Sequence, residues 1–228
     1  MRPSFNNEYG GSFVLIEPGQ NGDLVVEEPF FIGARPVTQV EWSAVMGSNP
    51  SKFQDGWSAG LRPVESVSWL DCQAFIAKLN EEETEQRLGL SGIWRLPNAA
   101  EWEYACRAGS ETRWYHSDRD KDLDEVAWHA GNAGATTREV GQKKENEWGL
   151  YDCHGNVAEW TDSGDDNRRV TKGGSWLMES ESTTSSASGL SKVDKKSDAI
   201  GLRLVWSPIR FMCSIWDIHS ALPQPPMF

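Results

Sequence analysis

Short apolar runs bounded by Gly, Pro and Asn open the chain, and a helical pattern follows them. Residues 12–16 (SFVLI) and 29–34 (PFFIGA) are runs of this kind, and they predict two strands. Thr38 then precedes QVEWSAVMG, which predicts a short helix with Thr38 as its N-cap and Gly47 as its end. The beginning of the chain therefore combines strands with helices.

The clearest helical periodicity lies farther along, from Trp69 to about Gln86. Ser68 stands in the N-cap position, and Asp71 takes the place of the acidic residue of a capping box. Apolar residues recur at helical spacing and predict one buried face, made of Trp69, Cys72, Phe75, Ile76 and Leu79. The sequence EEETEQR then predicts that the end of this helix lies outside the core.

A third helix is predicted from Asn98 to Gly109, with Glu101 completing a capping box. After residue 110 the helical periodicity disappears. Single aromatic residues separated by Gly and Asn there predict loops and short strands. Irregular chain of this length needs buried Trp, Asn side chains or a bound metal to hold it. We expect one α+β domain.

Composition supports a single globular domain with an aromatic core. The 228 residues suffice to bury a core without disulfide or metal staples. Twelve tryptophans are costly to expose, so they predict a core built on large aromatic side chains. Four cysteines without a CxxC pair predict reduced, buried thiols, although the sequence also permits disulfides: Cys72, Cys106, Cys153 and Cys213.

The charge balance is acidic, with 22 Lys and Arg against 34 Asp and Glu and a net charge of −12. Because no basic stripe with interleaved aromatics is present, nucleic-acid binding is not expected. The N-terminus lacks the apolar core of a signal peptide, and no apolar run approaches the length of about 20 residues that spans a membrane. We expect a soluble monomer that is cytoplasmic when made, with display on a cell or virus surface left open.

One segment is compositionally unusual. More than half of the positions from Ser175 to Ser191 are Ser or Thr, which is common in linkers. A Gly-Gly-Ser-Trp turn precedes the segment and the apolar IGLRLV run follows it. The flanks therefore predict a structured setting for a segment that resembles a linker.

Seven short sequence motifs follow one another in an order that is known from one protein family. They are RPVTQVEW (35–42), NPSKF (49–53), RPVESVSWLDCQAF (62–75), RLPNAAEWEYACRAG (95–109), NEWGLYDCHGNVAEWT (146–161), KGGSW (172–176) and IGLRLV (200–205). Together they resemble the sulfatase-modifying-factor, or formylglycine-generating-enzyme, family over about residues 10–206. The resemblance implies a C-type-lectin-like fold of little regular structure, with a domain at 1–206. Residues 207–228 have no counterpart in the family pattern.

The resemblance implies three kinds of function: copper-dependent oxidation of a sulfatase cysteine, iron chemistry as in ergothioneine synthesis, or non-catalytic binding. The family's copper-binding cysteines match positions at or near Ser180 and Ser185, and residues 173–206 contain no cysteine. A hydroxyl cannot replace a thiolate on Cu(I). The four histidines are dispersed and show no metal-ligand spacing. We therefore expect neither copper nor catalysis, and an active oxidase is the least favoured interpretation.

The turn GLYDCHGNVAEW (149–160) is a candidate metal site. Asp152 and Glu159 flank a Gly-Asn turn, and the carbonyls of Gly155 and Val157 could add oxygen ligands suited to Ca²⁺. The resemblance implies a structural calcium at the matching positions. In the alternative interpretation, both carboxylates only accept hydrogen bonds from backbone amides of the turn.

Some non-catalytic members of the family are variable proteins of diversity-generating retroelements, whose lectin-like C-terminal segment is rewritten at template adenines. Small mixed residues between invariant turns, as in residues 173–206, are what such rewriting would leave. The predicted exposed and variable set comprises Trp176, Leu177, Glu179, Glu181, Thr183, Thr184, Ser186, Ser188, Leu190 and Ser191. This surface would bind a protein or another macromolecule. A catalytically dead or regulatory relative with a degenerate active-site loop is the alternative.

Overall fold

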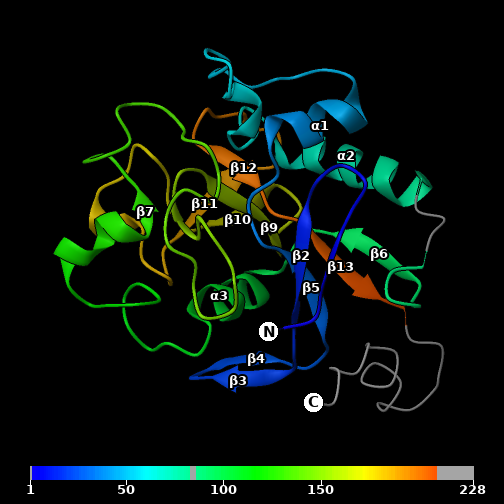
Figure 1. Ribbon diagram of the computed structural model, residues 1–228, viewed down its shortest axis with the longest axis horizontal. Coiled ribbons are helices and arrows are strands. Elements are labelled where there is room, and N and C mark those ends of the chain that lie inside the picture. Colours follow the sequence, from blue (N-terminus) through cyan, green and yellow to red (C-terminus); the bar gives the residue numbers. More distant parts are fainter. Residues whose placement is uncertain (1, 83–85, 210–228) are drawn as a thin grey trace, which may run out of the picture.

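The computed structural model describes residues 2–82 and 86–209, which form a pair of β-sheets that lie side by side (Figure 1). The larger sheet has five strands in the order β1-β2-β5-β13-β6, and the smaller has four in the order β11-β10-β9-β12. Two strand pairs, β3 with β4 and β7 with β8, complete the strands within the described residues. Helices α1 and α2 lie together above the sheets in Figure 1, and α3 lies on the opposite side.

The elements are short throughout. The α-helices are α1 (Gln39–Met46), α2 (Trp69–Glu82) and α3 (Ala99–Arg107). The strands before the last helix are β1 (Ser4–Asn6), β2 (Ser12–Ile16), β3 (Gly19–Asn21), β4 (Leu24–Val26), β5 (Phe30–Gly33) and β6 (Gly92–Arg95). Those after it are β7 (Ala127–Trp128), β8 (His154–Gly155), β9 (Ala158–Gly164), β10 (Arg168–Lys172), β11 (Ser188–Lys192), β12 (Ile200–Leu202) and β13 (Val205–Pro208). Short 3₁₀ turns lie at Ala59–Leu61, Asp120–Glu125 and Ser180–Ser182.

The inner strands β2 and β5 of the five-stranded sheet are covered on both faces, which explains why they read as nearly unbroken apolar runs. In β5, Phe31 packs with the α1 and α2 side chains, whereas Phe30 and Ile32 pack with those of α3. In β13, Trp206 packs in the core on the α1 and α2 side, and Val205 packs in the core on the α3 side. Neighbouring residues of a strand point to opposite faces, so each face receives every second side chain.

The predicted strands and helix starts are confirmed. Thr38 and Glu41 form a reciprocal capping box at α1, and Gly47 ends that helix in the left-handed conformation. Asn98 and Glu101 form a second reciprocal capping box, at the start of α3. The third helix ends one residue earlier than predicted, because Ala108 already has a left-handed backbone.

The predicted second helix differs at its end. Ser68 and Asp71 exchange hydrogen bonds as expected at its start. However, α2 ends at Glu82, and residues 83–85 lie outside the described residues, as does the segment 210–228 that includes most of the C-terminal extension. The fold continues through β13 to Pro208, two residues past the predicted domain end.

Past residue 110 the described chain has no α-helix, as the sequence predicted. Three cysteines, Cys72, Cys106 and Cys153, are buried free thiols, and Cys213 lies outside the described residues. None of the helices in residues 2–82 and 86–209 combines the length and the apolar character needed to cross a bilayer.

A fully buried ion pair lies at the four-stranded sheet, and one further hydrogen bond of its arginine reaches the five-stranded sheet. Arg203, which follows β12, donates from Nε and Nη2 to the two oxygens of Glu159 on β9, at 2.9 and 2.8 Å. Its other bonds go to the carbonyls of Gly33 and Tyr151, at 2.9 and 2.8 Å. The indole Nε1 of Trp102 on α3 also donates to Glu159. Both charged side chains have no exposed area, so this network satisfies two charges that water cannot reach.

We expect Arg203→Met to lower the free energy of unfolding by about 3–5 kcal/mol, because it leaves the Glu159 charge buried without a partner. The double variant Arg203→Met with Glu159→Gln should lose less than the single variant, since no uncompensated charge remains. Urea titration at neutral pH measures both. Lys52→Gln, which breaks the exposed Lys52–Asp198 pair, is the control and should cost less than about 1 kcal/mol. A double variant no better than Arg203→Met alone would contradict the assignment.

Candidate ligand-binding surface

The Ser/Thr-rich segment begins at a turn that only glycine can make. Gly173 and Gly174 both have left-handed backbones, with φ of 90° and 70°. A Cβ on Gly173 would meet the carbonyl oxygen of Cys153 at 2.9 Å, and one on Gly174 would meet that of Ser182 at 2.4 Å. The turn therefore packs directly on the scaffold and sets where the segment starts.

Backbone bonds then hold the segment along its length. The Trp176 amide donates to the Asn156 carbonyl at 2.9 Å, and the Ser185 amide donates to the Arg113 carbonyl at 2.7 Å. The segment finishes in β11, which pairs with β10 from Ser188 to Lys192. Because these bonds use peptide groups, they do not depend on which side chains the segment carries. The segment is an ordered portion of the domain and not a linker.

One buried lysine ties the middle of the segment to α3. Lys172 on β10 is 3% exposed, and its Nζ lies 3.0 Å from the carbonyl oxygen of Ser186. The same Nζ forms an ion pair with Glu103 at 2.9 Å. A side chain outside the segment thus positions it.

Six members of the predicted variable set are exposed and three are half-buried. The exposed ones are Leu177, Glu179, Glu181, Ser186, Ser188 and Leu190, and the half-buried ones are Trp176, Thr184 and Ser191. These nine residues follow one another along the segment between the Gly-Gly turn and the end of β11. The segment therefore offers most of the predicted side chains to solvent.

Thr183 is the exception, and its expected exposure is wrong. Its side chain has no exposed area and donates to the Ser180 carbonyl at 2.9 Å. A Cβ on Gly174 would meet its Cγ2 at 2.9 Å, so Thr183 packs over the Gly-Gly turn. The residue closes the 3₁₀ turn from within and cannot meet a ligand.

A hollow of about 260 Å³ lies in this surface. Its floor comes from Ala158, Thr171 and Gly174. Its walls come from the segment itself: Met178, Glu181, Ser182, Ala187, Ser188 and Gly189. Only Glu181 and Ser188 among these wall residues belong to the predicted variable set. Met178 and Ser182 were missed because nothing in the sequence marks which alternate residues of an irregular segment face the same side.

A second loop flanks the surface, and the sequence did not place it there. Phe53 packs edge-on against Trp176, with ring centroids 5.4 Å apart. The Trp176 Nε1 donates to the Asp198 carbonyl at 2.9 Å, and the Asp198 carboxylate pairs with Lys52. Trp176 is therefore anchored on both sides, which leaves it less free to vary than the prediction assumed.

The positions matched to the family's cysteines have different surroundings. Ser180 is half-buried, whereas Ser185 is fully buried beside the Cys106 thiol. Cys153 neighbours that thiol too, although the two cysteines are far apart in the chain. Burial, and then the Cys153 thiol, raise the pKa of Cys106 well above its usual value. Nothing in the sequence indicated this pair of thiols, which is sealed from solvent and in which the raised pKa of Cys106 keeps that thiol protonated.

One of the described histidines lies in the core. His154 is fully buried, and burial lowers its pKa to about 3, so the ring is neutral. Its Nε2 accepts a hydrogen bond from the Tyr115 amide at 3.2 Å. No group of three His, Cys, Asp or Glu side chains within residues 2–82 and 86–209 is arranged to hold a metal ion.

The four predicted calcium ligands lie on one turn, but one of them already has a cationic partner. Asp152 has a left-handed backbone, accepts a hydrogen bond from the Gly141 amide at 2.6 Å, and has a pKa raised to about 6 by burial. The Asp152 carboxylate could therefore serve as an oxygen ligand to a metal ion. Glu159 cannot, because both of its oxygens bind Arg203 and its charge is neutralised. Asp152, Gly155, Val157 and Glu159 therefore do not fit one calcium ion, and calcium binding stays a prediction.

Chelation tests whether this turn holds calcium despite the ion pair of Glu159 with Arg203. Because Arg203 already neutralises Glu159, we expect EDTA to leave the melting temperature of the purified protein within about 1 °C, with no gain on adding Ca²⁺. Thermal unfolding followed by circular dichroism measures both. A clear drop with EDTA that Ca²⁺ reverses would show that the motif holds calcium despite the ion pair.

Comparison with known proteins agrees with this geometry. The model of the sulfatase-modifying factor enzyme 1-like domain family matches residues 8–208. Chaperone protein LppX of Paenibacillus barcinonensis is 31% identical, and the match covers 87% of each chain. Inactive C-alpha-formylglycine-generating enzyme 2 of Bos taurus is 29% identical over 65% of this chain and 53% of its own length.

Among solved structures, Treponema denticola variable protein 1 has a similar fold, with a TM-score of 0.78 and 27% sequence identity. The superposition covers 90% of this chain and 99% of that one. The five-stranded and four-stranded sheets thus form a C-type-lectin-like fold of the formylglycine-generating-enzyme type, as the sequence predicted.

Proposed function

The chain belongs to the sulfatase-modifying factor enzyme 1-like domain family, and from that premise we propose that it is a non-catalytic ligand-binding member, the variable protein of a diversity-generating retroelement. Its binding surface is formed by residues 176–191, with the fully buried Thr183 and Ser185 excluded. The ligand is a protein or another macromolecule that contacts the exposed side chains and the hollow beside them. The observation that carries the proposal is the similarity to a variable protein over nearly the whole of both chains.

The way the segment is held supports this role. A diversified surface needs a backbone whose position does not depend on the side chains that change. Backbone hydrogen bonds to the carbonyls of Asn156 and Arg113, the Lys172 contact and pairing with β10 provide that independence. Small hydroxyl side chains next to a few large apolar ones also make adaptable contact surfaces.

The surroundings of the segment also speak for binding without catalysis. Residues 173–206 contain no thiol that could hold copper, and the neighbouring Cys106 and Cys153 are buried away from solvent. Copper binding is therefore not included in the proposal. One relative is named an inactive formylglycine-generating enzyme, which agrees with loss of catalysis within the family.

A catalytically inactive or regulatory relative without diversification is the second candidate, and the same inactive relative favours it. The relative named a chaperone is compatible with either candidate, because chaperones act by binding other proteins. The two candidates differ in one respect: only a diversified protein is encoded with a second copy of its variable codons.

Sequencing the locus separates them. We expect a reverse-transcriptase gene nearby and a near-copy of the codons for residues 173–206 that differs from the gene only at adenines of the copy. Populations grown from one cell should then accumulate substitutions at the exposed positions and none at Thr183. Absence of both the copy and the reverse transcriptase would overturn the diversified function and leave the inactive relative.

The surface itself is tested by substitution. Ser186→Arg should change the free energy of unfolding by less than about 0.5 kcal/mol, because the side chain is exposed. Thr183→Arg should cost more than about 3 kcal/mol, since it forces a charge into a site with no exposed area. Urea unfolding of both variants measures the difference. Equal losses of unfolding free energy in the two variants would contradict the assignment of Ser186 to the surface and of Thr183 to the scaffold.

A further inference from the structure

The last strand of the proposed binding surface leaves one edge of its sheet open. β11 ends the four-stranded sheet, and within the described residues only β10 pairs with it (Figure 1). Four of its five residues are exposed, and Gly189 is one of them. Because glycine has no side chain, it is the backbone that is exposed there. At the opposite edge of the same sheet, all three residues of β12 are buried. The open edge therefore coincides with the surface proposed for the ligand.

The register of β11 shows which of its peptide groups face outward. β11 pairs with β10 along its whole length without a bulge, and just past its end the Val193 amide donates to the Asn167 carbonyl at 3.0 Å. Bonded and non-bonded pairs alternate in an antiparallel ladder, so the even-numbered residues of β11 turn their peptide groups away from β10. Val170, which lies opposite Leu190, agrees with this pattern, because its carbonyl accepts a hydrogen bond from the Thr161 hydroxyl on β9. Leu190, at the centre of the strand, thus faces outward.

These outward peptide groups are free. Outside the ladder, no hydrogen bond within the described residues uses the amide or carbonyl of Ser188 or Leu190, whereas the Lys192 carbonyl accepts from the Lys195 amide at 3.0 Å. Proteins usually protect such an edge with proline, a bulge or charged side chains, since a free row of peptide groups pairs readily with another chain. The sequence of β11, SGLSK, has no such protection before its final lysine.

The hollow of the binding surface lies next to this edge. Thr171 and Gly189 are cross-strand partners, and both line the hollow of about 260 Å³. Residues that lie opposite each other on neighbouring strands point to the same face of a sheet. A residue placed beside Gly189 on an added strand would therefore point toward the hollow. Because Gly189 has no side chain, nothing on β11 blocks that approach.

We propose that β11 binds an extended segment of a protein ligand as an additional strand of the four-stranded sheet. The inference rests on the proposed function and names the class of its partner. The free peptide groups of Ser188 and Leu190 pair with the main chain of the segment, and one of its side chains enters the hollow. In strand addition, main-chain pairing supplies affinity and pockets for alternate side chains supply specificity. A surface whose side chains change thus keeps a constant contribution to affinity.

A peptide of about 12 residues, selected from a random display library on the full chain, is the probe. Amide NMR spectra measure its binding, and we expect a Kd of about 100 µM or tighter. Hydrogen exchange at the Leu190 amide should slow on binding, because this amide gains a partner. The Ser191 amide faces β10 and is the internal control, whose exchange should change much less.

Methylation of the peptide nitrogens tests the main-chain contact directly. An N-methyl group removes one donor and leaves the side chain in place. Methylation at every second residue, where the amide faces β11, should weaken binding at least about tenfold, and methylation at the residues between them less than about threefold. Equal effects at both sets of positions would overturn the proposal.

Two variants of the protein test the same contact from the other side. Leu190→Pro removes the outward amide, and an edge strand accepts proline where its N–H faces solvent. It should weaken peptide binding at least about tenfold, whereas Leu190→Ala keeps the amide and should weaken it less than about threefold. Urea unfolding checks that both variants fold. If Leu190→Pro does not fold, the methylated peptides decide the question.

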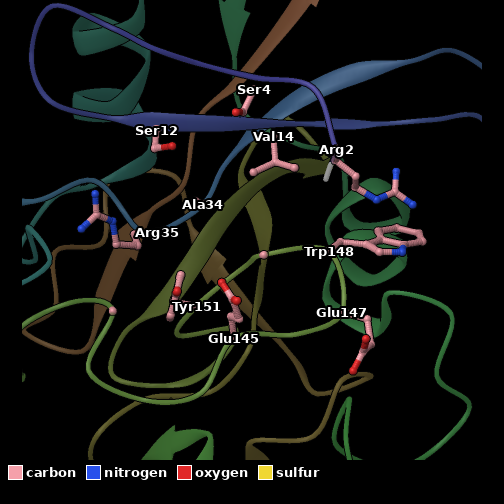
Figure 2. A pocket seen from close by; sticks show the side chains of 12 residues that line it. Arg2, Ser4, Ser12, Val14, Ala34, Arg35, Glu145, Glu147, Trp148 and Tyr151 are labelled. Carbon is pink, nitrogen blue, oxygen red and sulfur yellow. The ribbon is translucent and has the colours of Figure 1, made fainter. Parts of the chain in front are cut away.

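Three other results would overturn the proposal. One is the absence of any selected peptide with a Kd below about 1 mM. Another is a set of shifts confined to Val14, Gly149 and Tyr151, which line a separate cavity of about 560 Å³ (Figure 2). The third is a Leu190 amide that is protected in the free protein and loses protection on dilution, since a second copy of the chain would then occupy the edge.

Failure of this inference is distinguishable from failure of the proposed function. Peptide binding that Ser186→Arg abolishes, but that neither Leu190→Pro nor methylation weakens, would overturn strand addition and leave the variable surface as the binding site. Absence of the reverse transcriptase and of the second codon copy would overturn diversification, whatever the peptides show.

Discussion

The buried hydrogen-bond network around Arg203 and Glu159 connects the two sheets and α3 in the interior of the protein. Five hydrogen bonds from Arg203 and Trp102 converge there, and their partners come from β5, β9 and the loop at Tyr151. A buried charged group needs hydrogen-bond partners, because an unpaired ion in a low-dielectric interior costs several kcal/mol of folding free energy. Arg203, held in place by Glu159, therefore links the four-stranded sheet to Gly33 of the five-stranded sheet.

The four-stranded sheet determines what the Ser/Thr-rich segment can do. The strands β9 and β10 form the floor under the segment, and the Gly173–Gly174 turn packs on Cys153 and Ser182. The structure holds the segment by backbone groups and by Lys172, a side chain that lies outside it. In a scaffold of this kind, the stability of the fold does not depend on which side chains the segment carries. A binding surface whose residues change requires this independence.

Local chemistry made much of the fold predictable. The helix starts at Thr38, Ser68 and Asn98 depend on side chains within three residues, so a short window of sequence contains the whole interaction. The apolar runs of β2 and β5 were predictable for the same reason. The candidate surface was only partly predictable, since burial of Thr183 depends on its packing over Gly174 and on the path of the turn between them.

By itself, the sequence determined the strands and helix caps, the family resemblance, and the lack of a thiol in residues 173–206. Each of these follows from residue identity or from neighbours in the chain. Only the tertiary structure decided that Glu159 faces Arg203 and that Cys106 meets Cys153. These are pairings between distant residues. The sequence shows that a carboxylate is present but not whether its partner is an arginine side chain or a metal ion. Only folding determines which group lies within hydrogen-bonding distance.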